Sequence, residues 1–151
     1  MASKEFLSFL LRAKKNTYAS GKPAELTSRP ASHDMQYAED PYLYIDTWLG
    51  GFHFIGQEAV WHKGIAIWGM NYYGKMLVAS APDGFSHFLK ASLLQVPEKF
   101  PYRGPASYSE GDFDYHCACR GTLLSFEGEE AISYQKEIVY RLTFHGGEVK
   151  D

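Results

Sequence analysis

Two carboxylates lie inside runs of aromatic and apolar residues, where acidic side chains are uncommon. Asp46 stands in the segment YLYIDTWL, and Glu58 stands in the segment FIGQEAVW. In a strand, alternation would turn Asp46 to the same side as Tyr44 and Trp48. A carboxylate in such company must be hydrogen-bonded, paired with a cation or open to a cavity, because an unpartnered buried charge is very unfavourable.

An aromatic box closed by a carboxylate is one interpretation of this pattern. Such a box binds a small aromatic or cationic molecule, and cation–π attraction contributes roughly 1 kcal/mol or more once water is removed. Glu58 would supply the charge, and the walls and directional hydrogen bonds would come from Trp68, Tyr72, Tyr44, Asn71 and Asp46. The structural alternative is that Glu58 accepts hydrogen bonds from tyrosines or the backbone, at a strand bend that Gly56 permits.

A degenerate second copy of the Glu58 segment follows 72 residues later. FIGQEAVWHKGIAIWGMNYYG at 54–74 aligns without a gap with FEGEEAISYQKEIVYRLTFHG at 126–146, and five of the 21 positions are identical. Average residue usage would give roughly one identity. Glu130 takes the place of Glu58, and a glutamate that recurs in both copies favours a structural role for Glu130.

The two copies differ in their polar residues. Asn71 and Tyr72 of the first copy correspond to Thr143 and Phe144 of the second. The capacity for directional hydrogen bonds is therefore concentrated in the first half, and a ligand site is expected there.

Two other groups of residues could do chemistry. His33 and Asp34 resemble a base with its orienting carboxylate, but neighbours in a strand point to opposite faces, which favours a local hydrogen bond. Cys117 and Cys119 are poorly spaced for a disulfide, and free thiols fit a reducing compartment. A single C-x-C without a second pair does not predict a zinc site, so we expect no metal.

These residues need an α+β framework to position them. Helices are expected over Lys4–Lys15, capped by Ser3, and over Gly84–Gln95, capped by Asp83. Long loops are expected at Asn16–Pro30 and Lys99–Gly111, and Gly146–Asp151 should fray. Strands are expected at His33–Tyr37, Tyr42–Leu49, Phe52–Trp61, Ile65–Tyr73, Phe113–Gly121 and Leu123–Gly128, followed by a final hairpin whose core-facing set is Ile138, Tyr140, Leu142 and Phe144.

The chain of 151 residues is the size of one domain. We expect residues 1–151 to form a single domain from two duplicated units, about 1–76 and 83–151, each a helix followed by antiparallel strands. The units would share one curved sheet with both helices on one face, because one helix gives an isolated half little to pack against.

Charge and motifs exclude several classes of function. With 15 basic and 18 acidic residues the chain has a net charge of −3, which argues against direct nucleic-acid binding. No apolar run approaches the roughly 20 residues of a membrane span, so a cytoplasmic protein is expected. No P-loop, dinucleotide fingerprint, G-x-S-x-G or H-E-x-x-H motif is present, and no cofactor is predicted.

Four motifs in order give the chain a family resemblance. SRPASHD (28–34), YLYIDTWLGG (42–51), FIGQEAVW (54–61) and IWGMNYYG (67–74) resemble a bacterial family catalogued as a domain of unknown function. Members of that family stand alone or follow Xre-type helix-turn-helix regulators. The resemblance implies a ligand-sensing or interaction role and no particular activity.

A second resemblance rests on architecture. Duplicated α+β units with a glutamate in an aromatic groove look like effector-binding domains of GyrI type, which bind cationic or amphipathic small molecules. Small-molecule binding or sensing is therefore the leading prediction for this chain. The alternatives are a small enzyme that uses Glu58 or Asp46 as general acid or base, and a protein–protein interaction module. The oligomeric state is left open.

Overall fold

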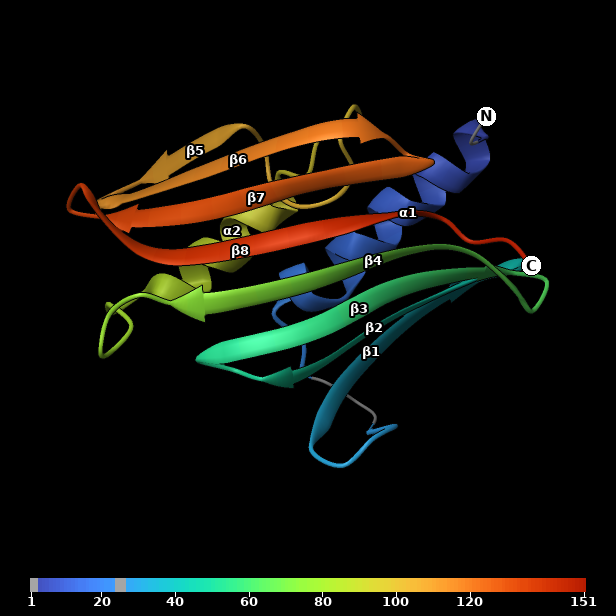
Figure 1. The fold of residues 1–151 in the computed structure, drawn as a ribbon, viewed down its shortest axis with the longest axis horizontal. Helices are drawn as coiled ribbons and strands as arrows, with labels where there is room; N and C mark the ends of the chain where they lie inside the picture. Colours follow the sequence, from blue (N-terminus) through green and yellow to red (C-terminus); the bar gives the residue numbers. More distant parts are fainter. Residues whose placement is uncertain (1–2, 24–26) are drawn as a thin grey trace.

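In the part of the chain that the structure describes, the fold is α+β, with two α-helices and one antiparallel sheet of eight strands (Figure 1). The computed structural model describes residues 3–23 and 27–151. In chain order the elements are α1 (Lys4–Asn16), the 3-10 turn η1 (Tyr18–Ser20), β1 (Ser32–Glu39), β2 (Tyr42–Gly50), β3 (His53–His62), β4 (Ile65–Met76), α2 (Phe85–Leu94), β5 (Ser107–Glu110), β6 (Phe113–Thr122), β7 (Ser125–Tyr134) and β8 (Glu137–Glu148). No helix in the described part of the chain is long and apolar enough to cross a membrane.

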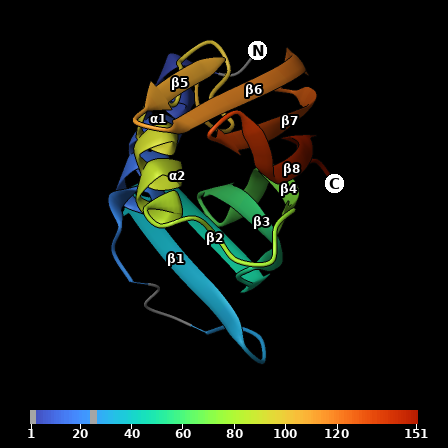
Figure 2. The ribbon, with the colours of Figure 1, turned by 90° about the vertical axis from the view of Figure 1, so that its left-hand side faces the viewer.

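The sheet joins the two halves of the chain through their last strands. Its strand order is β1-β2-β3-β4-β8-β7-β6-β5, so β4 and β8 pair at the centre, with Tyr72 opposite Phe144. Figure 2 shows the sheet curling around α1 and α2, which lie beside each other in its hollow. One cluster of buried apolar side chains extends through both halves and includes Phe9, Trp68 and Phe126.

Both helices bury an apolar stripe, but only α1 has the predicted cap. The Ser3 hydroxyl accepts a hydrogen bond from the Phe6 amide at 3.1 Å, and the α1 helix begins at the predicted residue. The cap of α2 is Gly84 and not Asp83, and no side chain caps this helix. Gly84 has φ 82°, a left-handed conformation that glycine adopts without a Cβ penalty, and this geometry replaces the expected side-chain cap.

The strand predictions fail where a strand carries an extra residue. In the β7–β8 hairpin Ile132 pairs with Tyr140, whereas Ser133 pairs with Ile138. The extra residue, Val139, shifts the alternation, so Ile138 is 44% exposed and not core-facing. The β3–β4 hairpin has a register shift at the corresponding place, between Val60 and Trp61.

Chain ends and loops also differ from the predictions. The strand expected at Leu123–Gly128 begins at Ser125 and continues to Tyr134 as β7. The end expected to fray at Gly146 instead belongs to β8, because Gly146 pairs with both Phe126 and Met70. The loop expected at Lys99–Gly111 contains the short strand β5. The loop expected at Asn16–Pro30 contains η1, and its residues 24–26 lie outside the described part.

Candidate functional site

Five charged side chains are buried together under the sheet. The cations are Lys14 from α1 and Arg103 from the segment between α2 and β5, and each is 8% exposed. The carboxylates are Asp46, Glu58 and Glu130, which are 5%, 4% and 1% exposed. Two cations therefore face three carboxylates, and the partners of each carboxylate decide which one is left without a counterion.

Glu130 has the most complete set of partners. Arg103 donates to it from Nε at 3.1 Å and from Nη2 at 2.6 Å, which is a bidentate ion pair. The hydroxyls of Tyr115 and Tyr140 donate to the same carboxylate at 2.6 and 2.8 Å. Four hydrogen bonds and a neutralising cation satisfy Glu130 within the protein, which is the arrangement that a structural role predicts.

Glu58 also has a counterion of its own. Lys14 Nζ forms an ion pair with the Glu58 carboxylate and donates a second hydrogen bond to the Tyr102 carbonyl oxygen at 2.8 Å. Burial lowers the pKa of Lys14, and the Glu58 charge opposes that shift. The pair ties α1 to β3, so the charge that was expected to face a ligand is already neutralised.

Asp46 is the one of these three carboxylates that forms no ion pair with a described residue. It lies on β2 directly opposite Glu58 on β3, and the Tyr72 hydroxyl donates to its Oδ1 at 2.6 Å. Burial and then the neighbouring Glu58 charge raise the pKa of Asp46 to about 7, although Tyr72, Lys14 and Arg103 act in the opposite direction. Among the described residues, the Tyr72 hydroxyl is the one side-chain hydrogen-bond donor that Asp46 has.

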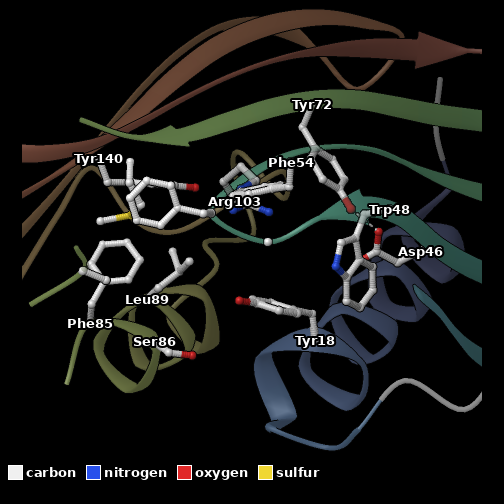
Figure 3. Close-up of a pocket in the computed structure, with 14 residues that line it drawn as sticks. Tyr18, Asp46, Trp48, Phe54, Tyr72, Phe85, Ser86, Leu89, Arg103 and Tyr140 are labelled. Carbon is white, nitrogen blue, oxygen red and sulfur yellow. Dashed lines mark hydrogen bonds between the residues drawn. The ribbon is translucent and has the colours of Figure 1, made fainter. Parts of the chain in front are cut away.

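Asp46 borders a cavity of about 300 Å³ between the sheet and α2 (Figure 3). The walls are mostly apolar or aromatic and include Trp48, Phe52, Phe54, Met76, Phe85, Leu89 and Tyr140. Figure 3 shows the Tyr18 hydroxyl pointing toward the middle of this space. The Arg103 guanidinium lies 5.7 Å from the centre of the Tyr72 ring, which places it at the same boundary.

The predicted site residues divide into four groups. Asp46 and Tyr72 line the cavity. Tyr44 and Glu58 line a separate space of about 30 Å³ that Asp46 also borders. Trp68 is core: it stacks on Phe126 and its Nε1 donates to the Leu123 carbonyl oxygen at 3.0 Å.

Asn71 does not reach either space. It is exposed, and its side-chain oxygen accepts a hydrogen bond from Gln57 at 2.9 Å. Asn71 is adjacent to Tyr72 in β4, and alternation along a strand turns it to the opposite face. The prediction that Asn71 and Tyr72 belong to one site is therefore wrong, because the two side chains lie on opposite faces of β4.

The cavity also contains residues that the sequence pattern did not single out. Alternation predicts Trp48 on the Asp46 face, but the predicted site does not include it. Tyr18 and Arg103 come from segments predicted as loops. The sequence holds one signal for Arg103, which is the first residue of RGPAS at 103–107, a segment similar to RPAS at 29–32 in the first half. Nothing in the local pattern showed that this arginine is buried.

The His33–Asp34 pair is not a catalytic unit. Asp34 accepts hydrogen bonds from the Ser28 amide at 2.9 Å and from the Thr47 hydroxyl at 2.6 Å. His33 is exposed and stacks on Trp48, with 5.4 Å between the ring centres. The two side chains thus serve different local contacts, as their positions in a strand predict.

Comparison with known proteins identifies a family. Residues 46–149 match the family model described as Domain of unknown function (DUF5680). The match begins at Asp46 and includes all of the strands from β3 to β8. No curated protein and no solved structure is significantly similar to the chain.

Proposed function

We propose that this chain, which belongs to the family Domain of unknown function (DUF5680), binds a small molecule in the cavity beside Asp46. The ligand would present an aromatic or alicyclic body to the walls and a cationic or hydrogen-bond-donating group to the Asp46 carboxyl. The cavity replaces the box around Glu58 as the predicted site, because Lys14 already neutralises Glu58.

The observation that supports this function best is a buried carboxyl without a counterion at the edge of an aromatic cavity. Asp46 is 5% exposed, and a hydrogen-bond donor brought by a ligand would satisfy it at a site from which water is largely removed. The volume of about 300 Å³ lies at the lower end of the usual range for ligand pockets, roughly 300–1,000 Å³. A ligand of one or two rings fits that size.

The sequence resemblances support the same class of ligand. Effector-binding domains of GyrI type bind cationic or amphipathic small molecules, and a sensing role is what the resemblance to regulator-fused domains implies. We also propose that the halves of the chain derive from one duplicated unit. The register shifts beside Val60 and beside Ile132 support this origin, because they are 72 residues apart, like the two sequence copies.

General acid–base catalysis is the second candidate function. A carboxyl with a pKa of about 7 exchanges its proton readily at neutral pH, and Arg103 at the cavity edge could stabilise a developing negative charge. The discriminating result is turnover of a bound compound with a bell-shaped pH profile that Asp46→Asn abolishes. Binding without turnover favours the sensor.

A thermal-shift screen tests the binding function. Wild type and Asp46→Asn are screened against cationic aromatics, polyamines, nucleosides and small carboxylates, with Asp112→Asn as a control. Asp112 is exposed in the turn between β5 and β6 and lies outside the cavity lining, so the same substitution there leaves the site intact.

The expected result is a stabilisation of the wild type and of Asp112→Asn that Asp46→Asn loses or greatly reduces. A ligand present at 100 times its dissociation constant stabilises the folded state by about 2.7 kcal/mol, which such a screen detects. Equal shifts in all three proteins would place binding elsewhere, and the absence of any shift with the wild type would reject the binding function.

A further inference from the structure

Among the residues that the structure describes, the buried charges under the sheet do not sum to zero. Lys14 from α1 and Arg103 from the α2–β5 segment contribute two positive charges, and Asp46, Glu58 and Glu130 from β2, β3 and β7 contribute three negative charges. The two cations are committed to Glu58 and Glu130 by direct ion pairs. One negative charge is left over, and it belongs to Asp46.

The other described groups around Asp46 supply no third cation. Tyr72 from β4 donates its hydroxyl hydrogen, and burial raises the pKa of Tyr72 and of Tyr44 well above 10, so both stay neutral. Met35 faces Asp46 from β1 and is apolar. Within the described residues no histidine lines the cavity. The Asp46 carboxyl is therefore neutralised either by a proton or by something that enters the cavity.

We propose, on the basis of the small-molecule site described above, that the cavity binds a monocationic amine in exchange for the proton of Asp46. The ammonium group donates an N–H to the carboxylate as the carboxyl proton leaves for solvent, so the net charge under the sheet is unchanged. Charge is conserved in this exchange, because one ammonium ion is bound for each proton that is released.

Charge and hydrogen bonding define the ligand further. Tyr72 occupies Oδ1, so Oδ2 remains to accept a hydrogen bond, which a primary or secondary ammonium supplies and a quaternary one does not. A second positive charge would have no partner among the apolar walls. A ligand carboxylate could pair only with Arg103, but Glu130 already accepts hydrogen bonds from the Nε and Nη2 of Arg103. The carboxylate would also add a negative charge and so restore the excess of one negative charge under the sheet.

Exchange with a proton makes the affinity for the amine depend on pH in one direction. Below the pKa of Asp46 the amine competes with the proton, and its affinity rises about tenfold per pH unit; above that pKa the affinity is constant. With the pKa at about 7, the dissociation constant should be about 30-fold larger at about pH 5.5 than at about pH 8.

Isothermal titration calorimetry with three matched probes tests the exchange. The probes are 2-phenylethylamine, its neutral analogue 2-phenylethanol and the zwitterion L-phenylalanine. Each is titrated into the full chain at about pH 5.5 and about pH 8, in two buffers with different ionisation enthalpies. We expect the amine to bind most tightly, with the 30-fold pH effect and release of close to one proton at the lower pH.

Two further measurements keep the test decisive. Asp46→Asn should lose both the preference for the amine over the alcohol and the pH effect, whereas the exposed Asp112→Asn should keep both. In the unliganded wild type, carbon-13 NMR of the side-chain carboxyls should show Asp46 titrating near neutral pH, whether or not any probe binds.

The outcomes separate this inference from the binding function itself. If the alcohol or phenylalanine binds at least as tightly as the amine, or if the amine binds without a pH effect, the cavity is a ligand site but proton exchange is rejected. An Asp46 carboxyl that is ionised in the free protein at about pH 5.5 also rejects it. If no probe binds at any pH, both the binding function and the monocation are rejected for ligands of this size.

Discussion

Replacing Asp46 by Asn should change how the stability of the protein depends on pH. In the folded protein burial raises the pKa of Asp46 to about 7, whereas in the unfolded chain its pKa is about 3.9. Between about pH 4 and about pH 7 the folded state therefore keeps a proton that the unfolded state has lost. The contribution of Asp46 to stability is fully present below about pH 4 and is lost as the pH rises through about 7.

The size of the effect follows from the shift in pKa. Each unit corresponds to about 1.4 kcal/mol, so the shift of about three units makes the wild type lose about 4 kcal/mol of unfolding free energy between about pH 4 and about pH 8. Asparagine has the shape of the protonated carboxyl and does not titrate. The Asn variant should therefore gain about 4 kcal/mol relative to wild type over the same pH range.

Urea unfolding at several pH values between about 4 and about 8 measures this difference. Other carboxyls and histidines titrate in the same range, so the quantity of interest is the free energy of the variant minus that of the wild type at each pH. The exposed Asp112→Asn variant serves as the control, and its difference from wild type should stay nearly constant. A difference for Asp46→Asn that is flat, or that falls as the pH rises, would refute the assignment of Asp46 as the uncompensated carboxyl.

Two predictions concern the framework that holds the site. Arg103→Met should destabilise the fold by roughly 3–5 kcal/mol in urea unfolding, because it leaves a buried carboxylate unpaired, whereas Arg12→Met in an exposed ion pair should have little effect; similar losses would contradict the charge assignment. Gly56→Ala should lower the melting temperature, since a Cβ there would lie 2.4 Å from the Tyr72 hydroxyl oxygen and 2.7 Å from a backbone oxygen. Gly51→Ala meets nothing within 4 Å and should be tolerated, so equal shifts for the two glycine variants would argue against close packing around Tyr72.

Much of the fold could be predicted because its signals are local. Alternation of apolar residues located β2 and β3, and the apolar stripe after Ser3 located α1. Alternation no longer predicts which face a side chain lies on once a bulge intervenes, and a bulge has no sequence signature as clear as that of a turn. For this reason alternation predicts Ile138 in the core, whereas the extra residue Val139 shifts the register of β8 and leaves Ile138 exposed.

The candidate site was harder to predict because its charges are paired over long sequence distances. Asp46 and Tyr72 could be found, since both lie on strands whose inward faces alternation identifies. Alternation predicts Glu58 as the charge of a ligand site because its partner Lys14 lies 44 residues away on a helix, in a basic segment that looks solvent-exposed. A residue-level pattern reports which way a side chain points but not which side chain from another element meets it.

The two halves of the sheet explain why the uncompensated charge occurs on one side only. Glu130 has Cys117 opposite it across the β6–β7 pairing, whereas Glu58 has Asp46 opposite it across the β2–β3 pairing. Burial raises the pKa of Cys117 to about 12, so this position is neutral where the first half carries a carboxyl.

The same difference recurs on the neighbouring strand. Tyr72 pairs with Phe144 at the centre of the sheet, and only Tyr72 has a hydroxyl to donate to a carboxylate. The first half thus has both an additional carboxyl and the donor that orients it, and the second half lacks both. In the second half, Glu130 and its partners form a complete buried ion pair without a counterpart of either group. Asp46 and Tyr72 both lie at the edge of the cavity, and this difference between the halves supports our proposal that a ligand uses them.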